Sequence, residues 1–364
     1  MKTFFVTGVT GTLGKEFVRN ILANGDERLI VLVRRSKRLS HWDRMRKILM
    51  EFGLEDHLGT RIQVFEGDIT RPQMGLTPED VNFSRKNVDE FFHIAALTAL
   101  NGSEEDCRTI NFGGTQEALK FAWDFYRNGK MKRFFYFSTA YASGSRQTYC
   151  AKEDELPQRP MHANFYESSK FAAETKVREA LAQGLPVTIF RPSIVVGDSV
   201  TGQVSEFNVI YPFMKLFAHG MISILPTHPE NSFNIVPIDF VIHASREISK
   251  QPSSIGKTYH LVTQNPPTID MLLQVKNEDY PTLPPVNMIA PETFKKETLD
   301  AMGQSVYQIL EPYLGYLNDH LTFDTSNTQL ALQGTGIQFP KTDKIFLKIL
   351  LDYAVSSGYL MVNA

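Results

Sequence analysis

The sequence lacks the features that mark several large classes of protein. Only two cysteines, Cys107 and Cys150, occur in 364 residues, which excludes a disulfide-stabilised scaffold and favours a reducing compartment. The net charge is only −2, so the chain has no basic footprint and nucleic-acid binding is not expected. No apolar run is long enough for a transmembrane helix, and the N-terminus enters a strand-like segment without a signal-peptide pattern. We therefore expect a soluble cytoplasmic protein.

Metal-ligand and hydrolase patterns are also missing. The nine histidines are scattered, and no pair of them has the spacing of metal ligands or lies beside a cysteine pair. His93 falls within an apolar strand-like run, where a packed or hydrogen-bonded core residue is a better interpretation than a catalyst. There is no convincing nucleophile elbow of a serine hydrolase. No metal is expected.

Strand-like and helix-like segments alternate through the first half of the chain. Apolar runs typical of strands occupy residues 3–7, 29–34, 61–66, 90–95, 133–138 and 186–191. Such alternation predicts an α/β fold, a Rossmann-type doubly wound parallel sheet with helices on both faces. We assign residues 1–197 to this domain and expect strands within 233–263 to return to it.

The alternation loosens after residue 197. An apolar and aromatic segment, residues 207–225, is interpreted as a core helix or cap element, with one wall of an apolar substrate channel as the alternative. The segment from about 286 to the end has mostly helical patterns. We predict that residues 198–232 and 264–364 form a smaller, mainly helical substrate-binding region.

Three glycines stand between the first strand and the first helix. In this turn Gly8 permits a tight reversal, Gly11 lets the backbone approach phosphate, and Gly14 lets the helix lie close to the sheet. The helix N-terminus then offers N–H groups and a positive dipole end to a dinucleotide pyrophosphate. The spacing differs by one residue from G-x-G-x-x-G. We predict that the cofactor is contacted by Thr7, Gly8, Thr10, Gly11, Thr12, Leu13 and Gly14.

The end of the second strand carries two arginines where an enzyme that prefers NAD usually has an acid. A guanidinium matches the extra phosphate of NADP by charge and by its fork of donors. A solvated basic surface that includes Lys37 and Arg38 is the alternative. We favour the phosphate site, with Arg34 first and Arg35 second, and expect NADP(H) as the cofactor.

A tyrosine and a lysine four residues apart share one helical face, Tyr166 and Lys170 in YESSK. The ammonium is expected to lower the phenol pKa, which is near 10 in water, and to hold the nicotinamide ribose. A hydroxyl at the end of the fifth strand, Thr139 with Ser138 as the fallback, would orient the substrate oxygen. A tyrosine and a lysine at this spacing often occur by chance. The order of these motifs along the chain, after the glycine turn, nevertheless predicts a hydride-transfer enzyme.

These motifs together resemble the extended short-chain dehydrogenase/reductase superfamily over roughly residues 1–275. Within it the chain looks most like the thioester reductases, namely fatty acyl-CoA reductases and the terminal reductase domains of carboxylic acid reductases and peptide synthetases. The superfamily motifs are TGVTGTLG, FYFSTAY and YESSK. The narrower ones are LVRR with a basic helical insertion, RIQVFEGDIT, GLTPEDV, FNIVPIDFVIHA and KTYHLVT.

The resemblance implies further site residues. Asn111 would brace the active-site backbone, although helix capping and packing would explain the NFGGT motif equally. The RPS motif would shape the cofactor mouth, or simply be a strand and turn. By the same resemblance, residues that flank the adenine, the nicotinamide or this mouth are Asp68, Ile69, Ala95, Arg191, Pro192 and Ser193.

The resemblance implies NADPH-dependent reduction of an acyl thioester to an aldehyde, with reduction onward to an alcohol left open. The acyl group would arrive as acyl-CoA or on a carrier protein, because the chain has no evident adenylation or carrier domain. One alternative is a carbonyl or 3β-hydroxysteroid-type dehydrogenase or a nucleotide-sugar epimerase. A lesser one is a non-catalytic NADP-sensing protein, which could dispense with Tyr166 and Lys170. The sequence does not predict the oligomeric state.

Overall fold

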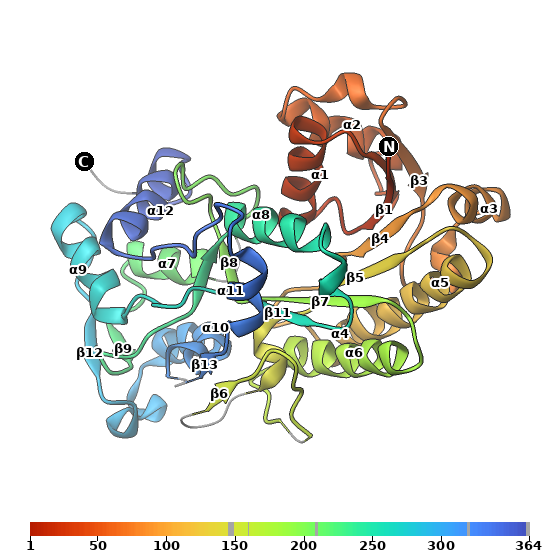
Figure 1. Ribbon diagram of the computed structural model, residues 1–364. Helices are drawn as coiled ribbons and strands as arrows, with labels where there is room; N and C mark the ends of the chain where they lie inside the picture. The colour runs from red at the N-terminus through yellow and green to blue at the C-terminus, as the bar shows by residue number, and fades with distance from the viewer. Residues whose placement is uncertain (145–148, 159, 208–209, 319–320, 362–364) are drawn as a thin grey trace.

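The structure is a computed structural model that describes residues 1–144, 149–158, 160–207, 210–318 and 321–361. A sheet with helices packed around it makes up the N-terminal part, and most of the C-terminal helices gather to one side of it (Figure 1). Within the ranges given, no helix combines the length and the apolar character needed to cross a membrane.

The central sheet has seven parallel strands in the order β11-β7-β5-β4-β1-β2-β3. The order reverses between β1 and β4, and ligands of doubly wound sheets bind beyond the carboxyl ends of the strands at such a point. This topology confirms the predicted Rossmann-type fold. The strands are β1 (Thr3–Thr7), β2 (Arg28–Val33), β3 (Ile62–Glu66), β4 (Glu90–His93), β5 (Arg133–Phe137), β7 (Val187–Pro192) and β11 (Thr258–Leu261).

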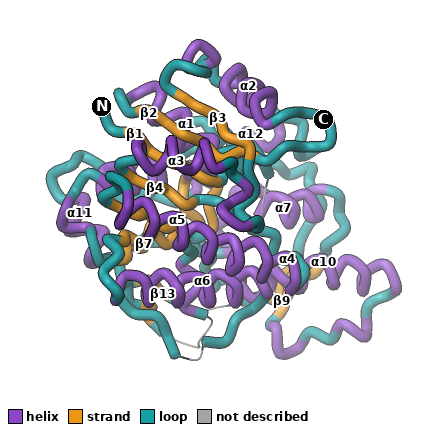
Figure 2. Tube along the Cα trace, turned by 90° about the vertical axis from the view of Figure 1, so that its right-hand side faces the viewer, coloured by secondary structure: helices purple, strands orange, loops and turns teal. Residues whose placement is uncertain are grey.

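Helices cover both faces of the sheet because its strands are apolar on both sides. Phe4 and Val6 of β1 belong to one core cluster, and Phe5 between them belongs to the other. The first face is covered by α1 (Thr12–Asn24), α2 (His41–Glu51), α8 (Ile238–Ser249) and α11 (Ser326–Leu332). The second is covered by α3 (Pro78–Asn87), α5 (Gly114–Asn128) and α6 (Phe165–Ala182), which lie one below another in Figure 2.

The C-terminal part has an apolar core of its own. Phe213 and Phe217 of α7 are buried in it, as the core-helix interpretation predicts, while residues 208–209 lie outside the described residues. Its helices are α7 (Ile210–Ala218), α9 (Ile269–Asp279), α10 (Ala301–Leu317) and α12 (Lys344–Ser356). Two-stranded sheets pair β8 (Ile194–Val196) with β10 (Ile235–Pro237), β9 (Ile224–Pro226) with β12 (Asn287–Ile289), and β6 (Cys150–Ala151) with β13 (Thr322–Phe323).

The two strands expected to return to the domain of residues 1–197 both pair with strands of that range, but only one of them joins the central sheet. β11 pairs with β7 at the sheet edge, but β10 pairs with β8 in a separate ladder. The reason lies at the end of β7, where Pro192 cannot donate to a ladder and the chain leaves the sheet before β8 begins. β4 likewise ends at His93, two residues earlier than predicted.

Candidate functional site

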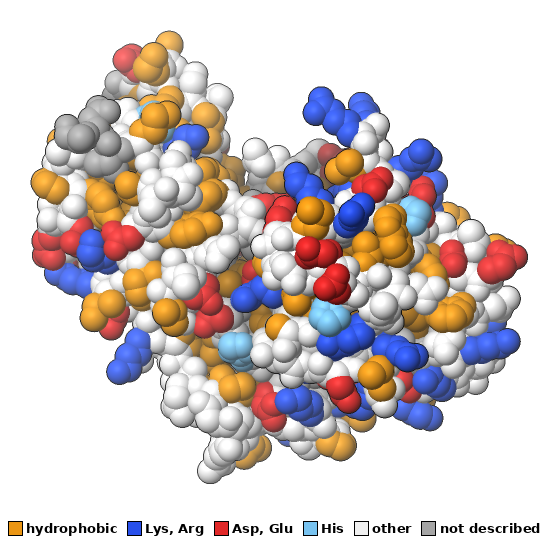
Figure 3. Space-filling model, turned by 90° about the horizontal axis from the view of Figure 1, so that it is seen from above, with side chains coloured by type: hydrophobic (Ala, Val, Ile, Leu, Met, Phe, Trp, Pro, Cys, Tyr) orange, Lys and Arg blue, Asp and Glu red, His pale blue; other side chains and the backbone are white. Residues whose placement is uncertain are grey.

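A cavity of about 840 Å³ lies at the carboxyl ends of the central strands. Seen from above, the surface is hollowed between the C-terminal part and the part that carries α1 and α2 (Figure 3). The cavity wall takes residues from the turns that follow six strands, and it adds side chains from α2, α6 and α10. It therefore joins segments that are distant in the sequence.

The glycine turn after β1 forms one part of this wall. Gly8 has φ +81°, and a Cβ there would lie 2.5 Å from the main-chain nitrogen of Ala95. A Cβ on Gly14 would lie 2.1 Å from the Gly8 oxygen, so neither position accepts a side chain. Gly11 caps α1 and has no side chain to satisfy the first N–H groups of the helix. The turn and the helix start therefore form a cradle that suits a phosphate.

Two arginines line the cavity near the end of β2, Arg34 and Arg44. The Arg44 guanidinium donates to the main-chain oxygen of Arg34 at 2.5 Å, and burial and the charge of Arg34 together lower the pKa of Arg44. Arg34 lies 3.9 Å from the Asp68 carboxylate. Arg35, the second choice from the sequence, is exposed and does not line the cavity.

Sequence reasoning missed Arg44 as a site residue, although it noted the basic helix. Ser40 caps α2, and the helix buries Met45, Ile48 and Leu49. Arg44 adjoins this apolar stripe and therefore reaches from the edge of the core towards the second strand. The position of Arg44 beside the apolar stripe, rather than its charge, is the sequence feature that could have identified it as a site residue.

Of the residues implied around the cofactor, Ile69 and Ala95 line the cavity. Asp68 and Thr7 do not. The Asp68 carboxylate accepts bonds from the nitrogen and hydroxyl of Thr70, at 2.9 and 2.8 Å, which closes a turn. The Thr7 hydroxyl lies 2.8 Å from Nδ1 of His93. Burial lowers the pKa of His93 to about 3, so this histidine is a neutral core residue, as predicted.

Tyr166 and Thr139 meet at the cavity wall from α6 and from the end of β5. Burial raises the pKa of Tyr166 to about 12, while a hydrogen bond with Thr139 acts in the opposite direction. The Thr139 hydroxyl also accepts a bond from the nitrogen of Tyr141 at 3.3 Å. The phenol is therefore protonated at neutral pH and placed beside a second hydroxyl.

Lys170 lines the same cavity but does not lower the tyrosine pKa as expected. Its ammonium donates to the Phe137 oxygen at 2.6 Å and lies 4.5 Å from the centre of the Tyr136 ring. Burial lowers the pKa of Lys170 itself to about 7, despite the opposing effect of Glu174. For Tyr166, desolvation of the phenol, with a smaller contribution from the Glu167 charge, raises the pKa and outweighs the hydrogen bond with Thr139.

The hydroxyls at the end of β5 have different partners. Ser138 donates to the buried Glu174 carboxylate at 2.6 Å. Glu174 also binds Arg191 at 2.6 and 3.0 Å and Arg178 at 2.8 Å. Burial alone would raise the pKa of Glu174, but the arginines and Ser138 lower it to about 2. Thr139 is thus the hydroxyl that meets Tyr166.

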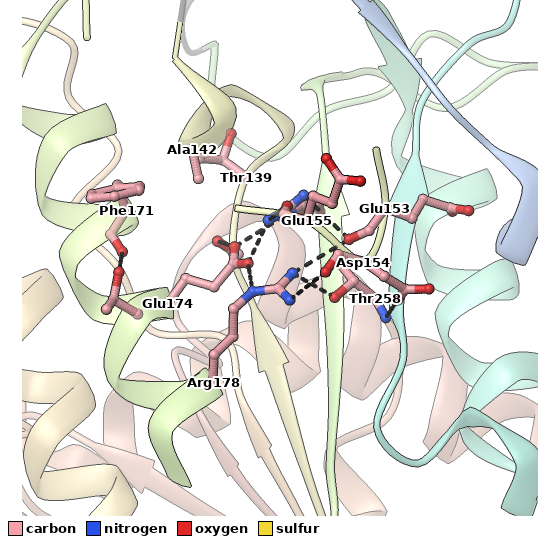
Figure 4. A network of polar contacts seen from close by, with 12 residues as sticks. Thr139, Ala142, Glu153, Asp154, Glu155, Phe171, Glu174, Arg178 and Thr258 are labelled. Carbon is pink, nitrogen blue, oxygen red and sulfur yellow. Dashed lines mark hydrogen bonds and ion pairs between the residues drawn. The ribbon is translucent and has the colours of Figure 1, made fainter. Parts of the chain in front are cut away.

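Arg191 lies in this buried network and does not line the cavity, unlike Pro192 and Ser193, so it does not shape a cofactor mouth. Its guanidinium is fully enclosed. It donates to the Glu174 carboxylate and to the main-chain oxygens of Lys152, Glu153 and Glu155. Figure 4 shows Arg178 reaching between Glu174 and the same segment.

Asn111 fastens the loop that follows β4. It lies in a π-helical segment, Arg108–Gly113, between α4 (Glu104–Cys107) and α5. Its side-chain oxygen accepts from the nitrogen of Leu97 at 2.7 Å, and its nitrogen donates to the Leu97 oxygen at 3.0 Å and to Ser169 at 2.9 Å. The side chain thereby connects a cavity loop to α6.

The C-terminal helix α10 supplies cavity residues that the sequence analysis did not identify, including Tyr313 and Tyr316. Tyr316 contacts the Tyr141 ring edge-on, with 4.8 Å between ring centres. Pro212 is the one residue of α7 in the described wall, so the channel-wall alternative for residues 207–225 is not supported. No local pattern marks α10 as part of a site, because its partners are distant in the sequence.

The cavity suits a nicotinamide dinucleotide. The glycine cradle accepts phosphates, and the two arginines add positive charge beside it. Ser193 lines the wall and is largely buried, yet its hydroxyl finds no hydrogen-bond partner in the part of the chain that the structure describes. A buried hydroxyl of this kind is normally satisfied, and a polar ligand group would do so.

The fold and this cavity define an NAD(P)-binding oxidoreductase of the extended short-chain dehydrogenase/reductase class, as the sequence motifs predicted. Residues 6–245 match the model of the male sterility protein family, a family of NAD-binding proteins. The chain belongs to that family.

Similar proteins include parts of much larger enzymes. The chain is 29% identical over 72% of its length to nonribosomal peptide synthetase asaC of Aspergillus flavus, and likewise to the L-2-aminoadipate reductase large subunit of Penicillium chrysogenum. It spans 26% and 19% of their lengths. The terminal R domain from the myxalamid PKS-NRPS biosynthetic pathway is 26% identical, with a TM-score of 0.85 over 100% of this chain and 93% of that one.

Proposed function

We propose that this protein is an NADPH-dependent reductase that converts an acyl thioester to an aldehyde and a thiol. The observation that carries the proposal is one cavity joining the glycine cradle, the Arg34–Arg44 pair and the Tyr166–Thr139 hydroxyls. Two relatives support the reaction type, one named as a terminal R domain and the other as an aminoadipate reductase.

NADPH, when bound, would supply the hydride. The turn at Gly8, Gly11 and Gly14 would hold its pyrophosphate, and Arg34 and Arg44 would bind the 2′-phosphate. Other cavity-lining residues proposed to contact it are Thr10, Thr12, Leu13, Ile69, Ala95, Pro192 and Ser193. Lys170 would hold the nicotinamide ribose.

The protein's own chemistry is proton transfer to the substrate oxygen. Tyr166 gives its proton to the carbonyl oxygen as the thioester carbon accepts the hydride, and Thr139 donates a hydrogen bond to the same oxygen. The hemithioacetal then returns its hydroxyl proton to the phenolate, and the C–S bond breaks. The aldehyde and a thiolate leave, the thiolate takes a proton from solvent, and Tyr166 is again protonated for the next cycle. Because its pKa is raised, Tyr166 is protonated at neutral pH and can act as the acid.

The acyl group would lie between the dinucleotide domain and the C-terminal part. We assign residues 198–232 and 264–364 to the substrate-binding region, apart from those that the structure does not describe. Ile309, Tyr313 and Tyr316 of α10 support this assignment, because they give that wall apolar and aromatic character. The thioester would be acyl-CoA or an acyl chain on a carrier protein.

A screen of CoA and carrier-protein thioesters of varied chain length tests the function. NADPH oxidation, free thiol and aldehyde should appear in equal amounts for at least one substrate. If NADPH is oxidised with simple carbonyl compounds but with none of the thioesters, the protein is instead the carbonyl dehydrogenase of the alternative. Tightly bound NAD that survives purification would identify an epimerase, which the Arg34–Arg44 pair disfavours.

A further inference from the structure

The helix α10 reaches both elements that carry the reacting hydroxyls. Gly315 brings it against the start of α6, since a Cβ there would lie 3.5 Å from that of Ala163. The next residue, Tyr316, is buried and lines the cavity. Its hydroxyl and its ring make contacts of different kinds, and each leads to a different element of the site.

The Tyr316 hydroxyl belongs to the cap of α6. Asn164 is the cap residue, and its side-chain oxygen accepts from the nitrogen of Glu167 at 3.0 Å. Its side-chain nitrogen donates to the Tyr316 hydroxyl at 2.9 Å. The Tyr316 hydroxyl also bonds the Glu167 carboxylate, which in turn accepts from the nitrogen of Ala163 at 2.9 Å. These hydrogen bonds form a network around the first turn of α6, the turn that carries Tyr166.

The Asn164 amide has two orientations that differ by exchange of its oxygen and nitrogen. Only one of them places the oxygen on the Glu167 N–H and so caps the helix. The Tyr316 hydroxyl selects that orientation, because it accepts from the amide nitrogen while it donates to the neighbouring carboxylate. Without this hydroxyl only the Glu167 N–H would hold the amide in that orientation.

The Tyr316 ring reaches the other element. It packs edge-on against Tyr141 at 4.8 Å between ring centres and 83° between planes. The main-chain nitrogen of Tyr141 donates to the Thr139 hydroxyl. One side chain from the C-terminal part thus contacts both the turn that holds Tyr166 and the turn that holds Thr139.

We propose that Tyr316 is a positioning residue, which holds the first turn of α6 through Asn164 and Glu167 so that Tyr166 stays aligned with Thr139. The proposal rests on the proposed function for the identity of the reaction, but the geometry it describes does not depend on the substrate. It also gives the C-terminal region a part in catalysis beyond enclosing the acyl group.

Two variants and a matched control test this role in the full chain. Tyr316→Phe removes the hydroxyl and keeps the ring, and Asn164→Ser keeps a helix-capping oxygen but removes the donor to Tyr316. The control is Tyr307→Phe, which removes a hydroxyl from the same helix at a ring that stacks on Phe294 and does not line the cavity. Kinetics and amide hydrogen exchange are measured for all of them.

In kinetics, both test variants should lower kcat by about 10- to 100-fold and leave the KM for NADPH unchanged, because small misplacements cost rate rather than cofactor affinity. The solvent deuterium isotope effect on kcat should rise as proton transfer becomes slower. A smaller fraction of active protein would lower kcat but would not change this isotope effect. The double variant should be no slower than either single one, since both act through the same bonds.

In hydrogen exchange, Tyr316→Phe should speed the exchange of the Glu167 and Ser168 amides by about fivefold, the loss expected for one hydrogen bond. Tyr307→Phe should leave both amides and kcat unchanged. Exchange equal to that of the original chain in Tyr316→Phe would overturn the positioning role, whatever the substrate. A chain that reduces no thioester would refute the proposed function instead, and the exchange rates would still decide the positioning role.

Discussion

The guanidinium of Arg44 lies 2.5 Å from the main-chain oxygen of Arg34, and both arginines line the same cavity. Burial and the charge of Arg34 lower the pKa of Arg44. An anion of more than one charge bound beside both side chains would relieve the repulsion between them. This pair is the structural basis for expecting NADPH rather than NADH.

Cofactor preference tests the arginine pair. Arg34→Glu and Arg44→Gln should each raise the KM for NADPH by about 10- to 100-fold, the loss of a charged hydrogen bond, and should change the KM for NADH far less. Arg35→Glu is the control, since this neighbour is exposed and outside the cavity wall. An equal effect on both cofactors would refute the phosphate assignment.

Removal of the proposed acid should separate chemistry from binding. Tyr166→Phe keeps the ring, so NADPH affinity measured by fluorescence titration should stay almost intact. Turnover should fall by about 10²- to 10⁴-fold, the usual contribution of a positioned acid. A variant with near-normal turnover would exclude Tyr166 as the proton donor.

The buried Glu174–Arg191 pair should matter for stability. Glu174→Gln leaves Arg191 enclosed without its counter-charge, and the free energy of unfolding should fall by about 3–5 kcal/mol. Lys176→Ala, which breaks an exposed pair with Glu179 on the same helix, should cost under about 1 kcal/mol. Urea unfolding at neutral pH measures both, and similar losses for the two variants would contradict the structure.

The same pair predicts an acid limit to stability. Because the pKa of Glu174 is about 2 in the folded chain and 4.5 ordinarily, its contribution is present above pH 4.5 and is lost as the pH falls towards 2. The stability difference between the original chain and Glu174→Gln should therefore shrink over that interval.

Lys170 predicts a change of stability in the alkaline range. Its pKa is about 7 in the folded chain against an ordinary 10.5, so between these values the unfolded chain binds the proton that the folded chain has released. This residue therefore makes the folded state more stable as the pH rises from 7 to 10.5. Lys170→Met should flatten that rise in urea unfolding, and the exposed Lys176→Met should not. Identical slopes for both would exclude a buried, desolvated Lys170.

Much of the fold follows from the sequence because its signals are local. Strands β1 to β5 and β7 lie within two residues of their predicted limits, since a buried parallel strand is one continuous apolar run. The glycine turn could also be predicted, because its conformation depends on neighbouring residues of the sequence. The two-residue strand β6 was not predicted. The pairing of β10 with β8 rather than with the central sheet could not be predicted, because a short apolar run does not indicate which strand it pairs with.

The candidate site was only partly predictable, for the same reason. Thr139, Tyr166 and Lys170 carry recognisable spacings, and all three line the cavity. In the sequence Arg191 stands among apolar residues, just as a cavity residue would. Only the fold shows that its side chain is buried in an ion pair with Glu174. Tyr316 meets Asn164 across 152 positions of the sequence, and no periodicity reports such a contact.

Hydride transfer to a thioester carbon is the central step of the proposed reaction, and labelled cofactor tests it most directly. NADPH carrying deuterium on the transferring face of C4 is incubated with the best thioester of the screen, and the aldehyde is analysed by mass spectrometry. We expect one deuterium at the aldehyde carbon for each thiol released, and neither product in quantity from Tyr166→Phe. Oxidation of the cofactor with no deuterium in an aldehyde would contradict the assignment.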